Sequence, residues 1–369
     1  MNLCIYSKKS EPEVSFKKQE HIFPASLGGL SKLPKGYVSD EINEKFSKDL
    51  ELDFTREGFL AIVRQFIGPG SRGNINNPKK ATQSKVHLIS DEDDNNALGY
   101  IVEGVPTYIK QIIFNLEDGA LSNSTKLIFP KTKNVTEELE KFLNADYKHI
   151  TLIRDIHIPE NEIILGLNEY QEKGKGALKK KWFIGHNPNV SINEDLKEKL
   201  KKFTKEVYLY SVGKKFDLTI EYKKVTSHQP IIFSQELFFR TCAKIAFNYV
   251  ASIVGQEAVL NKEFDVIRNY VLNGGDGDFL GFIDSEKVDG TILSPKSLGD
   301  KHAIVASFKE KDVLVNLIFY GNIYFVVKMT HEMDVYALLS MGSPVNGIIV
   351  DWRNRKEINI AEYCKYNKL

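Results

Sequence analysis

The chain has 369 residues and a mass of 42.0 kDa, which is too long for one ordinary domain and suits two or three. Its 50 Lys and Arg residues balance 49 Asp and Glu residues to a formal charge of +1, which excludes a protein that coats nucleic acid through a strongly basic chain. The sequence contains no run of about 18 apolar residues, so we expect no membrane span. Three cysteines are too few for a disulfide framework, and the N-terminus does not resemble a signal peptide, so we expect a cytoplasmic protein with reduced thiols.

Composition divides the beginning of the chain into a first region, residues 1–67, and a linker, residues 68–85. The first region mixes short apolar runs with turn residues and ends in a helical stretch. Ser39 precedes that stretch and is suited to cap its N-terminus. The linker is rich in Gly, Asn and Pro, a composition that predicts a tether rather than a regular element.

The second region, residues 86–233, is predicted to alternate between strands and helices. Residues 136–147 have the apolar spacing of an amphipathic helix that begins at Thr136. β-branched and aromatic runs closed by turn residues predict strands at 86–90, 99–116, 125–129, 150–158 and 207–212.

The third region, residues 234–369, is predicted to contain two helices and then an antiparallel meander of strands. Ser234 is placed to cap the first helix, which Gly255 closes, and the second helix ends at Gly274. The strand signals at 301–308, 312–321 and 323–329 are joined by short turns. The whole chain is therefore expected to have an α+β fold, with a small N-terminal module followed by a larger mixed α/β body.

Within the first predicted helix of the third region, three polar residues form one stripe. Arg240, Lys244 and Asn248 are four residues apart, so they share one side of an otherwise apolar helix. We expect this stripe to be a solvated face, with phosphate or ligand binding as the alternative.

The residues best suited to chemistry lie near the N-terminus. Glu20 and His21 are adjacent, and Pro24 and Gly28 follow, so the irregular backbone of a loop or strand end allows both side chains to share one site. Asn43 is placed at the beginning of the following helix. Carboxylate and amide oxygens suit Mg²⁺ or Mn²⁺, and a neutral His beside such a cation is able to deprotonate water. This pattern therefore predicts a one-metal site that hydrolyses a phosphodiester, formed by Glu20, Asn43 and His21.

Four lysines flank this predicted site and are candidates for neutralising the phosphates of a nucleic acid. They are Lys17, Lys18, Lys45 and Lys48.

The segments CIYS, EHIFPASLGG and VSDEINEKFS resemble the N-terminal module of prokaryotic HNH endonucleases. That module reads C-x-x-C, then E-H-I-x-P-x-S-L-G-G, then C-x-x-C-N-x-x-F, and the resemblance covers about the first fifty residues. It implies a ββα-metal fold that holds one divalent cation, with His21 as the general base and Glu20 and Asn43 as metal ligands. It also implies double-stranded DNA as the substrate, and prokaryotic defence against phages or plasmids as the setting.

The sequence departs from the HNH pattern at the cysteine positions. Cys4 is retained, but Ser7, Ser39 and Ile42 stand where the pattern has the other three thiolates. One thiolate does not form a tetrahedral zinc site, so no structural zinc is expected. Apolar packing must hold the module instead, and the residues expected to supply it are Phe23, Leu27, Ile42 and Phe46.

These observations lead to a metal-dependent HNH-type endonuclease as the main hypothesis. The body beyond residue 85 would recognise DNA, a small molecule, a protein partner or a second copy of the chain, because so small a module does not select substrates by itself. The alternative is a catalytically degenerate HNH-like scaffold or nucleic-acid-binding module. A third hypothesis makes the body a sensor of a nucleotide signal or a modified base that controls the nuclease.

Overall fold

The structure is a computed structural model. It describes residues 2–56, 58–67, 84–102, 104–117, 120–122, 125–130, 132, 134–171, 178–212, 225–229, 233–282, 293–309, 312–330 and 345–367. Helices and strands both contribute substantially, and the strands form several sheets, so the predicted mixed α+β fold class is confirmed. Most of the predicted linker, residues 68–83, lies outside the described residues.

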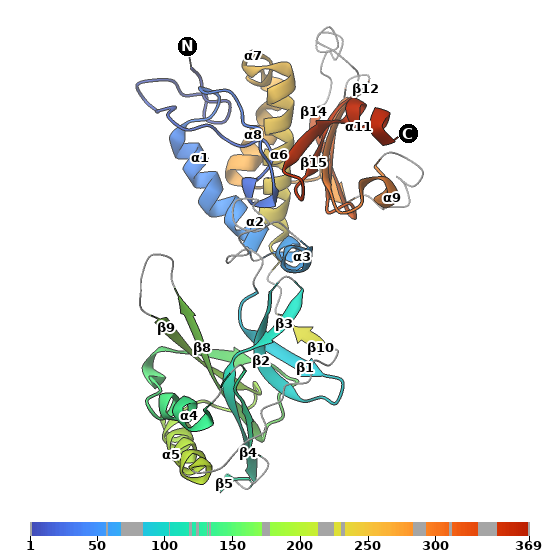
Figure 1. The fold of residues 1–369 in the computed structure, drawn as a ribbon. Helices are drawn as coiled ribbons and strands as arrows, with labels where there is room; N and C mark the ends of the chain where they lie inside the picture. The colour runs from blue at the N-terminus through green and yellow to red at the C-terminus, as the bar shows by residue number, and fades with distance from the viewer. Residues whose placement is uncertain are drawn as a thin grey trace. The chain divides into compact units, whose positions relative to one another are not determined.

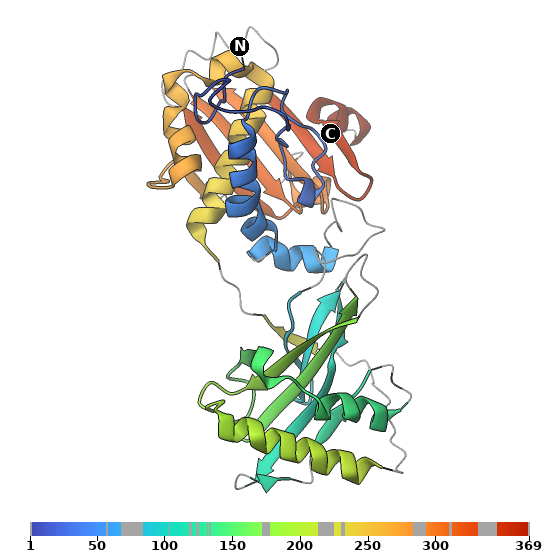
Figure 2. The same cartoon turned by 90° about the vertical axis from the view of Figure 1, so that its left-hand side faces the viewer.

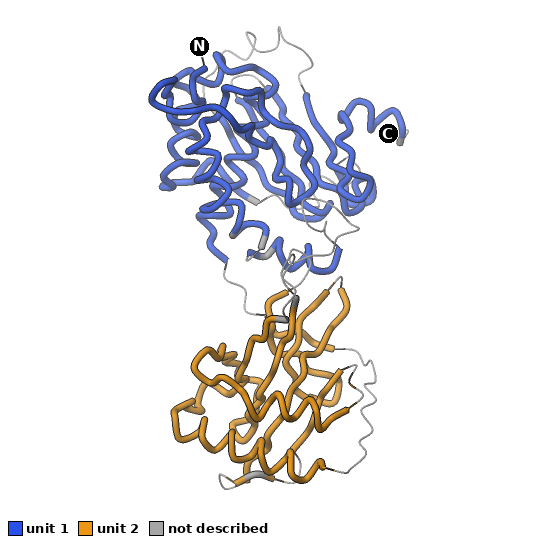
Figure 3. Tube along the Cα trace, turned by 60° about the vertical axis from the view of Figure 1, so that its left-hand side comes forward, with its two compact units in different colours: residues 1–83, 231–369 blue, residues 84–230 orange. Residues whose placement is uncertain are grey.

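The chain divides into two compact units (Figure 3). Unit 1 consists of residues 1–83 together with residues 231–369, and unit 2 of residues 84–230. The predicted boundaries near residues 85 and 233 therefore lie close to the observed ones. The expected separation of the N-terminal module from the C-terminal region is not observed, because buried residues from both segments, such as Phe46 and Phe247, belong to one hydrophobic core.

Unit 1 contains the N-terminal helices, the C-terminal helices and one large sheet. The N-terminal elements are η1 (Ala25–Leu27), α1 (Asp40–Phe46), the π-helical turn η2 (Ser47–Glu51), α2 (Leu52–Arg56) and α3 (Phe59–Ile67). The C-terminal helices are α6 (Gln235–Val254), α7 (Gln256–Val259), η5 (Lys262–Phe264), α8 (Asp265–Asn273), α9 (Pro295–Leu298) and α11 (Ile360–Asn367). The strands are β11 (Leu280–Phe282), β12 (His302–Lys309), β13 (Asp312–Phe319), β14 (Ile323–Thr330), β15 (Val345–Asp351) and β16 (Lys356–Asn359).

The sheet of unit 1 is antiparallel and has the order β11-β14-β13-β12-β15-β16. Strands β12, β13 and β14 form the meander that the sequence predicts. Helix α6 crosses one face of this sheet, and the helical segment that begins with α1 approaches α6 at η2 and α2 (Figures 1 and 2). Neighbouring residues of β12 point to opposite faces, so Ile304 joins the core under α6 whereas Ala303 joins a smaller core that includes residues of α9 and α11.

Helix α6 is the central element of unit 1. Ser234 caps its N-terminus by accepting a hydrogen bond from the backbone N–H of Leu237, and Gly255 follows its end, as the sequence predicts. Its length and composition would also allow it to cross a membrane, but 72% of its apolar window is buried inside the protein. It is apolar on nearly all sides because η2, α2, α8 and the sheet surround it.

The described part of the N-terminal module contains a helix, α1, where one is expected, but not the two expected strands. No β-strand occurs in the described part of residues 1–67; two isolated antiparallel bridges, Leu3–Ser10 and His21–Lys32, stand in place of the expected strands. Helix α1 follows the second bridge. The expected packing residues Phe23, Leu27, Ile42 and Phe46 are all buried in the core of unit 1.

Within its described residues, unit 2 contains two sheets and two α-helices. Its helical elements are α4 (Val135–Leu143), η4 (Tyr147–His149) and α5 (Glu194–Ser211). Its strands are β1 (His87–Asp91), β2 (Asn96–Val102), β3 (Val105–Tyr108), β4 (Lys110–Glu117), β5 (Ala120–Leu121), β6 (Lys126–Ile128), β7 (Ile150–Arg154), β8 (Glu162–Gln171), β9 (Leu178–His186) and β10 (Val225–His228).

The elements of unit 2 form three layers. One sheet has the order β10-β1-β2-β3, and the other has the order β5-β4-β8-β9-β7, with β6 also paired to β4. One core, which includes Leu98 and Ile164, lies between the two sheets, and a second core, which includes Phe142 and Trp182, lies between the larger sheet and helices α4 and α5.

Two sequence predictions in unit 2 are wrong. Residues 207–212 are predicted as a strand, but all except Val212 belong to α5, because Leu196, Leu200, Phe203 and Val207 continue one helical stripe onto the core. Helix α4 begins after Asn134 rather than at Thr136, because the Asn134 side chain caps it by accepting the N–H of Glu137.

Candidate functional site

Glu20 and His21 lie on one arm of a short hairpin in unit 1. The backbone N–H of Leu33 donates to the carbonyl of Glu20 at 2.8 Å, and the N–H of Ile22 donates to the carbonyl of Ser31 at 3.0 Å. His21 therefore faces Lys32 across the hairpin. These hydrogen bonds fix the backbone of the EHI segment although it is too short to count as a strand.

The two glycines of the EHIFPASLGG segment have steric roles in the loop of this hairpin. Gly28 has a φ of +100°, and a Cβ atom there would lie 2.5 Å from Cβ of Trp352. A Cβ atom on Gly29 would lie 2.1 Å from the carbonyl oxygen of Phe23. Glu357 of β16 anchors the end of the loop by accepting the N–H of Leu30 at 2.7 Å. The glycines therefore allow the hairpin to pack closely against the sheet of unit 1.

The carboxylate of Glu20 is buried and forms an ion pair with Lys244 of α6. The same Lys244 ammonium binds Glu51 at 2.6 Å, and no part of the Lys244 side chain is exposed. Burial alone would lower the pKa of Lys244, but the two carboxylates outweigh burial and raise it, so the ammonium remains charged. Burial raises the pKa of Glu20, and Lys244 opposes that shift. Lys244 thus holds two carboxylates from different segments around one positive charge.

Asn248, one turn after Lys244 on α6, fixes the backbone of His21. The hydroxyl of Tyr6 donates to Oδ1 of Asn248 at 2.7 Å, which directs the amide nitrogen of Asn248 toward the carbonyl of His21 at 3.0 Å. Tyr6 is itself buried edge-on against Phe46, with ring centroids 4.6 Å apart. The amide of Asn248 therefore has one orientation, and it holds the peptide that follows the Glu20–His21 pair.

The imidazole of His21 is half-buried beside charges of both signs. Burial, followed by the charges of Lys32 and Lys244, lowers its pKa, while Glu51 and Glu357 oppose the shift. The ring is therefore neutral near neutral pH, the state in which an imidazole accepts a proton.

The structure places Asn43 on α1, half-buried, with its backbone N–H bound to the carbonyl of Ser39 at 2.9 Å. Among the interactions of the described residues, none joins the Asn43 side chain to Glu20 or His21. The turn η2 continues from α1, and Glu51 at its end binds the buried ammonium of Lys244, which also binds Glu20. Such π-helical turns are rare and often occur at functional sites.

Three of the four positions that correspond to thiolates in the HNH pattern, Cys4, Ser7 and Ser39, lie close together. Cys4 is fully buried, and its sulfur accepts the backbone N–H of Ser39 at 3.4 Å. Burial raises the pKa of this thiol, but polar groups of Ser7 and Ser39 outweigh burial and lower it. The hydroxyl of Ser39 is buried and has no hydrogen-bond partner among the described residues, and Ile42 packs into the core. Polar contacts to one thiol and apolar packing thus hold the junction that four thiolates hold in the HNH pattern.

The four flanking lysines are exposed but differ in their contacts. The backbone N–H groups of Lys17 and Lys18 donate to the carboxylate of Asp40, at 3.0 and 2.7 Å. Lys48 forms an ion pair with Glu44 at 2.7 Å, and Lys45 donates to the carbonyl of Leu272 at 3.4 Å. None of these contacts buries an ammonium group, so phosphate binding by the lysines remains a prediction.

The donor chemistry of the buried carboxylates fits a hard divalent cation. Glu20 and Glu51 both direct an oxygen at one shared positive charge, which is the ligand type that Mg²⁺ and Mn²⁺ prefer. Here that charge is the ammonium of Lys244, so Lys244 would compete with a divalent ion for Glu20.

Sequence reasoning missed three residues of this site. The stripe that Lys244 and Asn248 share was expected to be a solvated face, and that expectation is wrong, because both side chains are fully buried. Their spacing of four residues on an apolar helix was the available signal. The sequence contains no comparable signal for Glu51, because a π-helical turn lies between Asn43 and Glu51 and α-helical spacing does not relate the two.

Comparison with known proteins gave no relative: no family model, no curated protein and no solved structure matches the chain.

Proposed function

We propose that unit 1 is an HNH-type, metal-dependent endonuclease that hydrolyses phosphodiester bonds of DNA. The observation that supports this most directly is that α6 binds both residues of the Glu20–His21 pair, Glu20 through Lys244 and the His21 carbonyl through Asn248. The carboxylate of Glu51, which binds the same Lys244 ammonium as Glu20, lies close enough to the His21 imidazole to act on its pKa, and burial keeps that pKa low. A carboxylate near a neutral imidazole is a combination suited to phosphodiester hydrolysis.

In this proposal His21 is the catalytic base and takes a proton from the water that attacks phosphorus. Lys17 and Lys18, exposed beside the hairpin, neutralise phosphates of the bound strand. Glu20 and Glu51, which meet at Lys244, would hold a divalent cation, which supplies positive charge to the scissile phosphate. Asn43 is a third ligand by the resemblance alone, because no described interaction joins its side chain to Glu20. Lys244 and Asn248 are positioning residues, because they act through Glu20 and through the His21 backbone. The cellular setting that fits the resemblance is defence against invading DNA.

A plasmid-nicking assay with Mg²⁺ or Mn²⁺ tests the role of His21. Loss of a general base typically lowers the rate by about 10²–10⁴-fold, and we expect a loss of this size for His21→Ala. His149→Ala is the matched control, because His149 is an exposed histidine of unit 2. Unchanged cleavage by a folded His21→Ala variant would exclude His21 from the mechanism.

A second candidate function is a degenerate HNH-like scaffold or nucleic-acid-binding module. The observation that favours it is the Lys244 ammonium between Glu20 and Glu51, because a permanent internal cation makes a divalent ion unnecessary. Calorimetric titration with Mn²⁺ separates the two functions. A nuclease gives a component of the heat that is lost in Glu20→Gln, whereas a scaffold gives the same heat with and without Glu20.

A further inference from the structure

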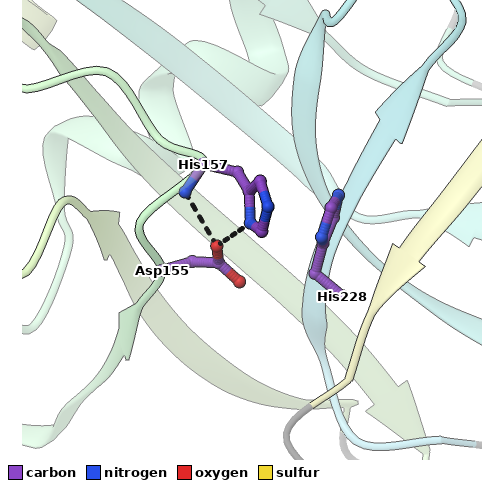
Figure 4. Close-up of side chains that lie close together, drawn as sticks. All are labelled: Asp155, His157 and His228. Carbon is purple, nitrogen blue, oxygen red and sulfur yellow. Dashed lines mark hydrogen bonds and ion pairs between the residues drawn. The ribbon is translucent and has the colours of Figure 1, made fainter.

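Unit 2 contains a cluster of one carboxylate and two imidazoles that the proposed nuclease does not use. Asp155 and His157 lie in the loop that follows β7, and His228 is the last residue of β10. One ligand atom from each lies within 4.8 Å of the others, and among the described residues this is the one such group of three. Figure 4 shows the imidazoles of His157 and His228 side by side above the Asp155 carboxylate. Their ring centroids are 4.1 Å apart.

A chain of hydrogen bonds determines the tautomer of His228. The amide nitrogen of Asn96 donates to the carbonyl of His157 at 2.8 Å, so Oδ1 of Asn96 is left to accept. The hydroxyl of Ser90 donates to that oxygen at 2.7 Å and thereby uses its single proton. The contact of 3.0 Å between Ser90 Oγ and Nε2 of His228 then requires Nε2 to carry the hydrogen. Nδ1 of His228 is consequently unprotonated and presents a lone pair.

The other two side chains of the cluster are also held in place. The carboxylate of Asp155 accepts two hydrogen bonds from His157, one from the backbone N–H at 3.0 Å and one from Nδ1–H of the imidazole at 2.7 Å. The Asp155 side chain is 15% exposed, and in the described part of the chain its ion-pair partner is His157 rather than a lysine or arginine. A mostly buried carboxylate thus faces two imidazoles with no fixed cation of its own.

Two imidazole nitrogens and one carboxylate oxygen form a donor set typical of Zn²⁺ and related first-row metals. An imidazole whose second nitrogen is fixed by a hydrogen bond is also typical of metal sites, because that bond orients the ring toward the ion. We propose that Asp155, His157 and His228 bind one transition-metal ion, Zn²⁺ foremost, and that Ser90 and Asn96 orient His228 for it. The ion would take the place of the proton between Nδ1 of His157 and the Asp155 carboxylate, and this proton would be released to water. The side chain of His157 is 54% exposed, which leaves room for water at the fourth position.

The positions of the ligands indicate what the metal does for unit 2. Strand β10 is an edge strand that pairs with β1 in the smaller sheet, whereas Asp155 and His157 follow β7 of the larger sheet. An ion bound by all three would join the end of β10 to the other sheet. We therefore expect Zn²⁺ to stabilise unit 2 against unfolding, since a ligand that binds only the folded state raises its stability.

Zinc binding by the full chain, without a histidine tag, tests the proposal. Equilibrium dialysis against Zn²⁺ should leave one ion per chain, and Co²⁺ in its place should give the visible absorption of a four-coordinate site. His157→Gln should weaken Zn²⁺ binding by more than tenfold, and removal of the Ser90 hydroxyl in Ser90→Ala by about 10–100-fold. His157→Gln is the safest ligand variant, because its exposed side chain has little effect on folding. His149→Gln is the matched control and should bind Zn²⁺ like the wild type.

Several results would overturn the proposal. These are a wild-type chain that retains no Zn²⁺, a His157→Gln variant with wild-type affinity, and zinc that is lost in His21→Ala instead of His157→Gln. A thermal melt adds a second readout, because Zn²⁺ should raise the melting temperature of unit 2 in the wild type and not in His157→Gln. The site is independent of the proposed nuclease, so failure of either proposal leaves the other intact.

Discussion

The ion pair between Lys244 and Glu20 offers the sharpest test of how unit 1 is held together. Replacing Lys244 with methionine keeps the length and apolar contacts of the side chain but removes its charge. Glu20, which is 6% exposed, is then left as a buried carboxylate with no cation. Breaking a buried ion pair on one side typically costs about 3–5 kcal/mol. We assign nearly all of this cost to Glu20, because Glu51 is 22% exposed and solvent screens its charge.

Fluorescence provides an assay that isolates unit 1. The chain has two tryptophans, and Trp352 belongs to unit 1 whereas Trp182 belongs to unit 2. In a Trp182→Phe background, the emission of Trp352 therefore reports the unfolding of unit 1. For a unit of this size, a loss of about 3–5 kcal/mol lowers the melting temperature by roughly 6–20 °C.

A double variant distinguishes an unpaired charge from lost packing. In Lys244→Met combined with Glu20→Gln, the buried charge is gone and a neutral amide remains beside Asn248. We expect this variant to recover at least about 2 kcal/mol relative to Lys244→Met alone. If Lys244→Met costs less than about 1 kcal/mol, or if the double variant is no more stable than the single one, the reasoning from a buried ion pair is refuted.

Three further predictions concern the stability of unit 1. Burial and the charge of Arg64 lower the pKa of His302 to about 3. Below pH 6.5 the imidazole therefore becomes protonated in the unfolded state but stays neutral in the folded state. Stability that is complete above pH 6.5 is therefore lost as the pH falls, by about 2 kcal/mol at pH 5, and denaturant titrations of His302→Asn should show a correspondingly smaller loss. Gly28→Ala should cost at least about 2 kcal/mol more than Gly36→Ala, although both residues have similar positive φ values. A Cβ atom on Gly28 meets Cβ and Cα of Trp352, which cannot move away, whereas one on Gly36 meets the end of the Asn2 side chain, which can rotate. Equal melting temperatures of the two variants would contradict this. Ser234→Ala removes the cap of α6 and should lower the unfolding free energy by about 1 kcal/mol in the same Trp352 assay.

The sequence determined the features that depend on neighbouring residues. The cap at Ser234, the end of α6 at Gly255 and the meander of β12, β13 and β14 follow from local spacing and turn chemistry, and all are observed. The Glu20–His21 pair was also recognisable, because its residues are adjacent in the chain. Where local propensity misled, as for residues 207–212, the apolar stripe of a long helix outweighed the preference of Val and Tyr for strands.

Tertiary structure alone decided which polar residues meet. Lys244 reaches Glu51 across 193 positions of sequence, and Asn248 reaches His21 across 227. The sequence of a helix with a polar stripe is the same whether the stripe is solvated or is buried and hydrogen-bonded to carboxylates. Only the packing of α6 against the N-terminal module shows that this stripe is buried. The cluster of Asp155, His157 and His228 depends in the same way on the return of β10 to the smaller sheet. Short-range spacing fixes helices and strands, whereas the position of a charge in the core is set by contacts between segments far apart in the chain.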